Sequence, residues 1–269
     1  LTINSNFQTA IISKDNLTIN NGNLDINSAG DGLKSDNGII TINDGIFSIN
    51  SEKQGIQSHS SIIINNGDIN IGNSSEGMEA EQIIINNGKI KIKSTDDGLN
   101  TSSNGGTDIK MIINGGIIEI DSQADGLDSN GDIELNGGKV IINGPTEKGN
   151  GAIDYDGIFK ITLGEIIAFG SSSMSMNASS DSKQNSVLIN LNSEQKSGTK
   201  FSLKDSAGNL VYEVSSTKSF SSIMFSADFL EKGDYIYELN GVNTGNFTIS
   251  STLTNVGNSR GMGRGPSPI

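Results

Sequence analysis

The sequence predicts an all-β protein: a right-handed parallel β-helix of about six regular coils, followed by a C-terminal antiparallel β-meander or small sandwich. Three observations predict this fold. The first is a short motif that consists of a polar residue, a glycine and an apolar residue. It recurs every twenty-odd residues, which is typical of stacked repeats. A second motif, hydrophobic-Asn-x-Gly, returns in step with the first. Between the two motifs, apolar and polar residues alternate as they do in strands with one buried face.

Two polar positions mark each repeat. The first motif occurs as Asp31-Gly32-Leu33, Gln54-Gly55-Ile56, Glu76-Gly77-Met78, Asp97-Gly98-Leu99, Asp125-Gly126-Leu127 and, altered, Gly151-Ala152-Ile153. The second motif supplies an asparagine column of Asn20, Asn43, Asn65, Asn86, Asn114 and Asn136. Asparagine and glycine tolerate left-handed backbone at tight corners, and stacked asparagine amides can hydrogen-bond to one another. We therefore expect the asparagine column to be structural.

Aligning the repeats produces three apolar columns. These columns are Leu24, Phe47, Ile69, Ile90, Ile118 and Val140; then Ile26, Ile49, Ile71, Ile92, Ile120 and Ile142; then Leu33, Ile56, Met78, Leu99, Leu127 and Ile153. Three short strands per repeat, each stacked on its own copy, describe a parallel β-helix. The twist of strands favours right-handed coiling.

The sequence divides into three parts. Residues 1–186 are predicted to form the β-helix, with 1–16 as an imperfect cap coil and the six regular coils in 17–158. Insertions at Ser103–Asp108 and Gly144–Asn150 lengthen loops beside the acidic motifs. Residues 187–256 form the predicted C-terminal domain, with strands at Val187–Leu191, Lys200–Leu203, Leu210–Val214, Ser222–Phe225, Asp234–Leu239 and Asn246–Ser250. Residues 257–269 are a low-complexity tail that contains both arginines.

Composition narrows the possible partners. The 269 residues carry a formal net charge of -13, which argues against a nucleic-acid partner. The sequence has no cysteine, so it has neither a disulfide framework nor a thiolate metal site. No apolar run is long enough to span a membrane. A partner that offsets negative charge, such as a divalent cation, is favoured. We expect an extracellular or cell-surface protein whose strand-like start follows a signal segment.

The acidic columns predict bound Ca²⁺. Neighbouring coils lie ~4.7–4.9 Å apart, and calcium lies ~2.3–2.6 Å from each oxygen ligand, so one ion fits between oxygens of successive coils. The candidate ligands are Asp31, Glu76, Glu79, Asp96, Asp97, Asn100, Asp125, Asp128, Asp154 and Asp156. Zinc or iron is disfavoured because His59 is the single histidine. The alternative is that these acids are solvated turn residues beside glycine.

Candidate carbohydrate contacts are fewer. Lys89, Lys91 and Lys93 alternate with isoleucines and form a basic stripe that faces outward, and Tyr155 is an aromatic residue of the coils. The alternative for the lysines is a solvated face with cross-strand ion pairs. Because the chain has no tryptophan, binding through calcium and polar columns is favoured over aromatic stacking.

The repeats resemble a known family. The segments that carry the resemblance are Asp31-Gly32-Leu33, Glu76-Gly77-Met78-Glu79, Asp96-Asp97-Gly98-Leu99, Asp125-Gly126-Leu127-Asp128-Ser129 and residues 150–157. They resemble the cellulose- and acidic-sugar-binding β-helix proteins of clostridial cell surfaces, often described as carbohydrate-binding domain-containing proteins. Ser186-Val187-Leu188 and the tail are similar too. The resemblance implies a polysaccharide-lyase-like β-helix, bound calcium ions and carbohydrate binding without demonstrated cleavage. Gln54-Gly55-Ile56-Gln57 departs from the pattern because it lacks acids.

These observations predict a calcium-dependent, non-catalytic protein that binds plant cell-wall polysaccharide, either cellulose or a pectic, uronate-containing glycan. One alternative is a calcium-dependent, pectate-lyase-like enzyme. Such an enzyme needs an arginine or lysine to take the α-proton, yet the predicted coils contain no arginine and their acid-rich segment offers no lysine base. A second alternative is a structural surface adhesin.

Overall fold

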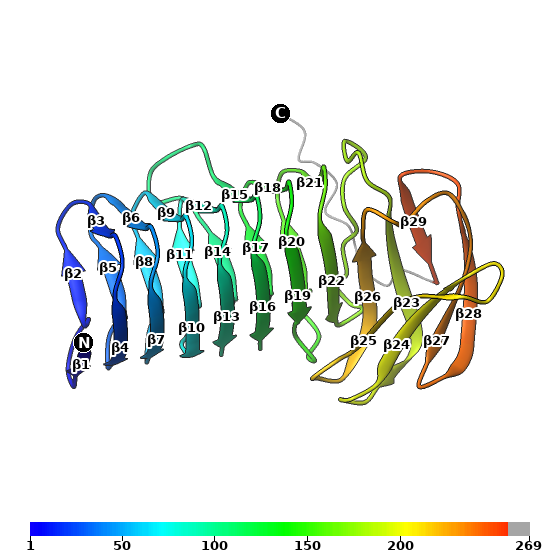
Figure 1. Ribbon diagram of the computed structural model, residues 1–269, viewed down its shortest axis with the longest axis horizontal. Coiled ribbons are helices and arrows are strands. Elements are labelled where there is room, and N and C mark those ends of the chain that lie inside the picture. The colour runs from blue at the N-terminus through cyan, green and yellow to red at the C-terminus, as the bar shows by residue number, and fades with distance from the viewer. Residues whose placement is uncertain (258–269) are drawn as a thin grey trace.

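The chain forms a long parallel β-helix that runs into a C-terminal pair of sheets, as a computed structural model shows (Figure 1). The structure describes residues 1–257, so residues 258–269 of the predicted tail lie outside it. All regular elements in this part of the chain are strands. No helix long and apolar enough to cross a membrane occurs among the described residues.

Three sheets form the walls of the β-helix. The longest, sheet A, contains β1 (Thr2–Ser5), β4 (Asn23–Ser28), β7 (Ile46–Ser51), β10 (Asp68–Asn73), β13 (Lys89–Ser94), β16 (Ile117–Ser122), β19 (Lys139–Asn143) and β22 (Glu165–Gly170). Sheet B contains β2 (Ile11–Ser13), β5 (Leu33–Ser35), β8 (Ile56–Ser58), β11 (Met78–Ala80), β14 (Leu99–Thr101), β17 (Leu127–Ser129) and β20 (Ile153–Tyr155). Sheet C contains β3 (Leu17–Ile19), β6 (Ile39–Ile42), β9 (Ser61–Ile64), β12 (Gln82–Ile85), β15 (Lys110–Ile113), β18 (Asp132–Leu135) and β21 (Phe159–Ile161).

The β-helix has seven coils. The first corresponds to the cap coil that the sequence predicts before the six regular coils, and it is more regular than expected. Its strands β1, β2 and β3 pair in register with β4, β5 and β6, as in Ile3 opposite Ile26 and Ile11 opposite Leu33. This coil lacks the Asp-Gly motif, so the repeat does not reveal it. Its side chains are less buried because no coil covers it within the described chain.

The core follows the predicted apolar columns. Every residue of the three columns is buried, and the columns belong to one continuous hydrophobic cluster. Strand register keeps identical positions stacked, as in Ile90 opposite Ile118 and Leu99 opposite Leu127. Stacking repeats buries surface that no single coil could bury alone.

The asparagine column forms a ladder at the corner between sheets C and A, which confirms its structural role. Each Nδ2 donates to the Oδ1 of the preceding coil. The distances are 2.8 Å for Asn43 to Asn20, 2.7 Å for Asn65 to Asn43, 2.8 Å for Asn86 to Asn65, 2.9 Å for Asn114 to Asn86 and 3.1 Å for Asn136 to Asn114.

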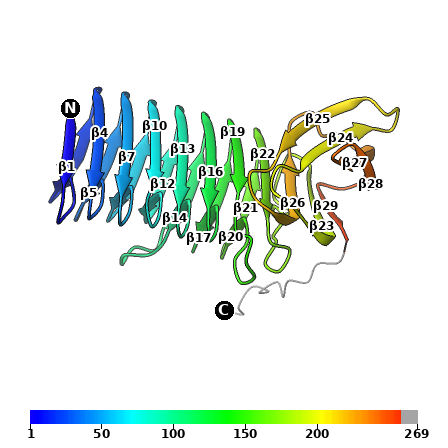
Figure 2. The same cartoon turned by 90° about the horizontal axis from the view of Figure 1, so that it is seen from below.

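The C-terminal strands close the end of the coil stack. Strands β26 (Phe220–Ser226), β23 (Ser186–Gln195) and β29 (Leu253–Val256) extend sheet A, and β26 pairs antiparallel with β22. Sheet D contains β25 (Leu210–Ser215), β24 (Lys200–Asp205), β27 (Gly233–Leu239) and β28 (Val242–Ile249) (Figure 2). Phe169 of the last coil belongs to the hydrophobic cluster that joins the two sheets. The predicted strands are all present, and β29 was not predicted.

The alternation of buried and exposed side chains can be tested on two adjacent residues of β16. Ile118 is fully buried, whereas Ile117 is 46% exposed. We expect Ile118→Ala to lower the free energy of unfolding by ~2–5 kcal/mol, because the substitution leaves a cavity in the core. Ile117→Ala should cost much less. Urea unfolding measures both, and equal losses would show that the side chains do not alternate as described.

Candidate functional site

The acidic residues occupy the corner where each coil leaves sheet A and enters sheet B. The backbone stays in register through this corner, since the Gly98 N–H donates to the Asp125 carbonyl at 2.9 Å. A Cβ at Gly98 would lie 2.4 Å from the Ile120 side chain, so the tight corner requires glycine. Two sets of side chains result, called here the corner column (Asp31, Gln54, Glu76, Asp97 and Asp125) and the strand column (Lys34, Gln57, Glu79, Asn100, Asp128 and Asp154).

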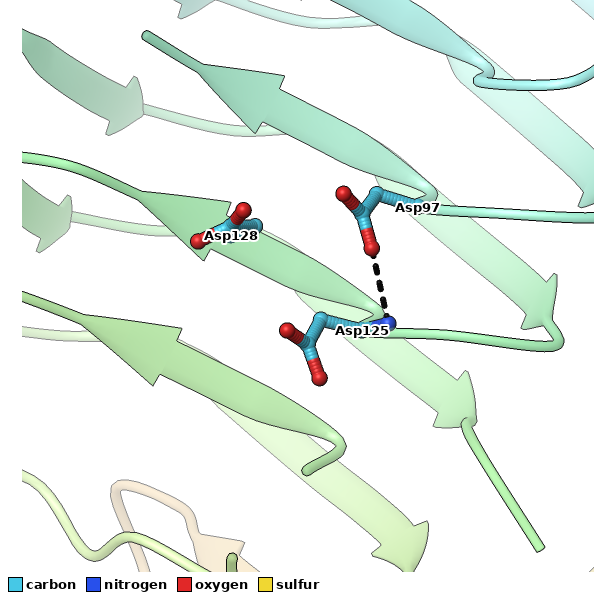
Figure 3. Close-up of side chains that lie close together, drawn as sticks. All are labelled: Asp97, Asp125 and Asp128. Carbon is cyan, nitrogen blue, oxygen red and sulfur yellow. Dashed lines mark hydrogen bonds between the residues drawn. The ribbon is translucent and has the colours of Figure 1, made fainter. Parts of the chain in front are cut away.

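Three aspartates of this corner lie together. Asp97, Asp125 and Asp128 each place a carboxylate oxygen within 4.8 Å of the others (Figure 3). Asp97 and Asp125 are each 8% exposed. The backbone positions the two residues, because the Asp125 N–H donates to Asp97 Oδ1 at 2.9 Å and the Gly151 N–H donates to Asp125 Oδ1 at 2.7 Å.

Burial and mutual repulsion disfavour the charged forms of these carboxyls. Burial, followed by the charge of Asp128, raises the pKa of Asp97 from 3.8 to about 7. Burial raises the pKa of Asp125 to about 8, with Asp97 adding to the rise. Burial and the neighbouring Asp154 raise the pKa of Asp128 to about 6. A cation among these oxygens would remove the repulsion.

Beside this cluster, two further oxygens lack partners within the described chain. Glu76 Oε2 and Asn100 Oδ1 are buried from solvent and accept no hydrogen bond from residues 1–257. Burial raises the pKa of Glu76 to about 8, with Glu79 and Asp97 adding to the rise. Buried oxygens of this kind normally have a partner. No lysine of the described chain forms an ion pair with Glu76 or with the three clustered aspartates.

Acids nearer the N-terminus have partners within the protein. Asp31 accepts hydrogen bonds from the Thr9 hydroxyl at 3.0 Å and the Gln54 N–H at 3.3 Å, and Lys34 Nζ lies 3.7 Å away. Glu79 Oε2 accepts bonds from the side-chain amides of Gln54 and Gln57, both at 2.9 Å. The structure therefore separates Asp31 from the clustered acids and occupies one oxygen of Glu79 with amides.

The remaining predicted ligands surround the cluster. Asp154 lies beside Asp128 in the strand column. Asp96 and Asp156 are exposed, and both add to the raised pKa of Asp128. The side-chain oxygens of the clustered residues and their predicted neighbours are carboxylates and the Asn100 amide, which suits a hard cation rather than zinc or iron.

The predicted carbohydrate contacts do not form one group. Lys89, Lys91 and Lys93 are exposed on the outer face of sheet A, with Lys91 Nζ 3.8 Å from a Glu119 oxygen. Tyr155 belongs to sheet B and occupies the register of the buried Ser129. Its hydroxyl donates to the Asn177 carbonyl at 2.8 Å. Tyr155 therefore faces the interior on sheet B, whereas the three lysines face solvent on sheet A.

Two features near the site were missed from the sequence. The loop after β14 arches back over earlier coils (Figure 1), where the Asn104 and Gly106 N–H groups donate to Glu81 Oε1 at 2.9 and 2.6 Å. Lys218, in the loop between β25 and β26, places its Nζ 2.7 Å from Asp121 Oδ1 on the outer face of sheet A. The length of the insertion signalled a loop but not its direction, and no local motif indicates where Lys218 lies.

Comparison with known proteins identifies one family. The family described as carbohydrate-binding domain-containing protein matches residues 1–151, which is more than half of the chain. The matched segment includes the first six coils and the clustered aspartates. No curated protein and no solved structure matches the chain significantly.

The raised pKa values predict how stability depends on pH once metal has been removed. The folded protein binds protons more tightly than the unfolded chain at Asp97, Asp125, Asp128 and Glu76. The free energy of unfolding should therefore fall as pH rises from about 4 towards 8. Melting temperatures in chelator across this range measure the effect. A metal-free protein whose stability rises between pH 5 and 8 would contradict the description of the corner.

Proposed function

The chain belongs to the carbohydrate-binding domain-containing protein family, and from this premise we propose that it is a calcium-dependent, non-catalytic binder of uronate-containing plant cell-wall polysaccharide. The family supports a carbohydrate-binding role, and the acidic corner supports the calcium dependence. We further propose that the protein acts at the bacterial cell surface or outside the cell, where such polymers occur.

The observation that carries this proposal is the set of stacked, buried carboxylates that have no cationic side chain from residues 1–257 beside them. The oxygens of Asp97, Asp125 and Asp128 lie within 4.8 Å of one another, and two ligands of one calcium ion are separated by at most ~5 Å. The unpartnered oxygens of Glu76 and Asn100 extend the same site by one coil. Calcium would be held by these residues, with the free Glu79 oxygen and Asp154 beside them.

Calcium also explains how an acidic protein would bind an acidic polymer. The chain carries a net charge of -13, so it repels a polyuronate. A bound ion offsets part of the local negative charge and supplies coordination positions for sugar carboxylates. The exposed Asp96 and Asp156 mark the edge where the corner meets solvent. The exposed Lys89, Lys91 and Lys93 on sheet A form a separate, basic surface for the same polymer.

A non-catalytic role is proposed because a lyase requires a basic group beside the metal. Lys218, which comes close to this part of the β-helix, is paired with Asp121 and the Ser122 carbonyl. All remaining ion pairs of the described lysines lie outside the clustered aspartates.

Polysaccharide binding tests the proposal. Wild-type protein should retain polygalacturonate in calcium and lose it in chelator, with cellulose tested in parallel. Unsaturated uronate products, followed by ultraviolet absorbance, should not form during long incubation. Binding that is insensitive to chelator would contradict the calcium role, and formation of those products would contradict the non-catalytic assignment.

Asp97→Asn provides a sharper test of the metal centre. The substitution removes a charge and keeps an oxygen, so we expect weaker calcium binding by calorimetry and a smaller rise in melting temperature on adding calcium. The fold should persist, since the amide oxygen can still accept the Asp125 N–H bond. Asp25→Asn is the matched control, because Asp25 is exposed on sheet A. Equal calcium affinity in the two variants would remove Asp97 from the site.

A further inference from the structure

A pocket of about 350 Å³ adjoins the acidic corner on its N-terminal side. It is lined by Lys34, Lys53, Gln54, Gln57 and Ser75, with the carboxylates of Asp31 and Glu52 at its wall. Gln54 belongs to the corner column, and Lys34 and Gln57 belong to the strand column. The pocket therefore continues the surface that carries the clustered aspartates.

The pocket differs from the rest of this surface in its charge. Its two lysines balance its two carboxylates, and both oxygens of Asp31 already accept hydrogen bonds. Lys53 is exposed and forms no ion pair with residues 1–257. On this acidic surface the pocket offers an unpaired ammonium group to an anion.

Its amides are also held in place. Gln54 and Gln57 both donate their side-chain N–H groups to Glu79 Oε2 at 2.9 Å. This leaves their amide oxygens to accept hydrogen bonds from hydroxyl groups. An ammonium group, fixed amide oxygens and a serine hydroxyl together match a sugar that has both a carboxylate and hydroxyls.

We infer that this pocket binds one uronate residue of the glycan, with its carboxylate on Lys53 and its hydroxyls on Gln57 and Ser75. The inference rests on the proposed function and extends it. Gln57 lies three coils before Asp128, a separation of about 14 Å at ~4.8 Å per coil. A polymer lying along the helix axis would thus contact lysine at one end and calcium at the other, with a short run of sugars between.

The test uses the full chain and an oligogalacturonate several units long, with affinity measured by calorimetry in calcium. Lys53→Ala should weaken binding about five- to tenfold, the scale of one lost hydrogen bond at a solvent-exposed group. Lys53→Arg should restore most of the affinity because it keeps the charge. Lys183→Ala is the matched control, since Lys183 is an exposed lysine far along the chain that forms no ion pair with residues 1–257. Calcium affinity without sugar should be the same in all variants.

The outcomes separate this inference from the proposed function. If wild-type protein binds the oligomer and Lys53→Ala binds it as tightly as wild type, the pocket assignment is wrong while the function holds. If Lys53→Ala and Lys183→Ala weaken binding equally, the effect is net charge, and the pocket is again excluded. If wild-type protein binds no acidic oligomer in calcium, the proposed function fails and the pocket assignment fails with it.

Discussion

In-register stacking is the constraint on which the rest of this structure depends. Each coil places its residues about 4.8 Å from the same positions of the next coil, so every column repeats one chemistry along the axis. Isoleucine columns fill the core, as Ile90 and Ile118 show. Asparagine is self-complementary, because its amide both donates and accepts, and the ladder from Asn20 to Asn136 uses both functions. Aspartate has acceptors only, so the same geometry that stabilises the ladder makes an aspartate column repel itself.

The protein resolves that repulsion differently along its length. In the early coils it supplies its own donors: Thr9 and Lys34 for Asp31, and two glutamine amides for Glu79. For Glu76, Asp97, Asp125 and Asp128, residues 1–257 supply backbone N–H groups but no positive side chain, and within this part of the chain buried oxygens remain unpaired. The change from Gln54 to Glu76 in the corner column marks this boundary. A structural role alone would be served by glutamine throughout, which is why the acid-rich coils point to a ligand.

The repeat made most of the fold predictable, because a periodic sequence states which residues are stacked. The apolar columns, the asparagine ladder and the register of Asn100 with Asp128 all follow from alignment of the repeats. The first coil was predicted only as an imperfect cap coil because it lacks the acidic motif, although its strands pair normally. Tyr155 does not point outward, because it occupies the same inward-facing strand position as the buried Ser129 of the preceding coil. The partners of Glu81 and Asp121 come from a folded-back loop and from the distant loop between β25 and β26. Both contacts depend on tertiary packing that no local pattern records.

The acidic corner thus unites the fold, the proposed metal and the proposed ligand, and locating the ion tests the account most directly. A crystal grown in calcium-containing buffer, with anomalous scattering recorded, would show whether an ion binds there. The account predicts an anomalous peak ~2.3–2.6 Å from carboxylate oxygens of Asp97, Asp125 and Asp128. A map in which these side chains turn away from one another into solvent, with no peak between them, would contradict it.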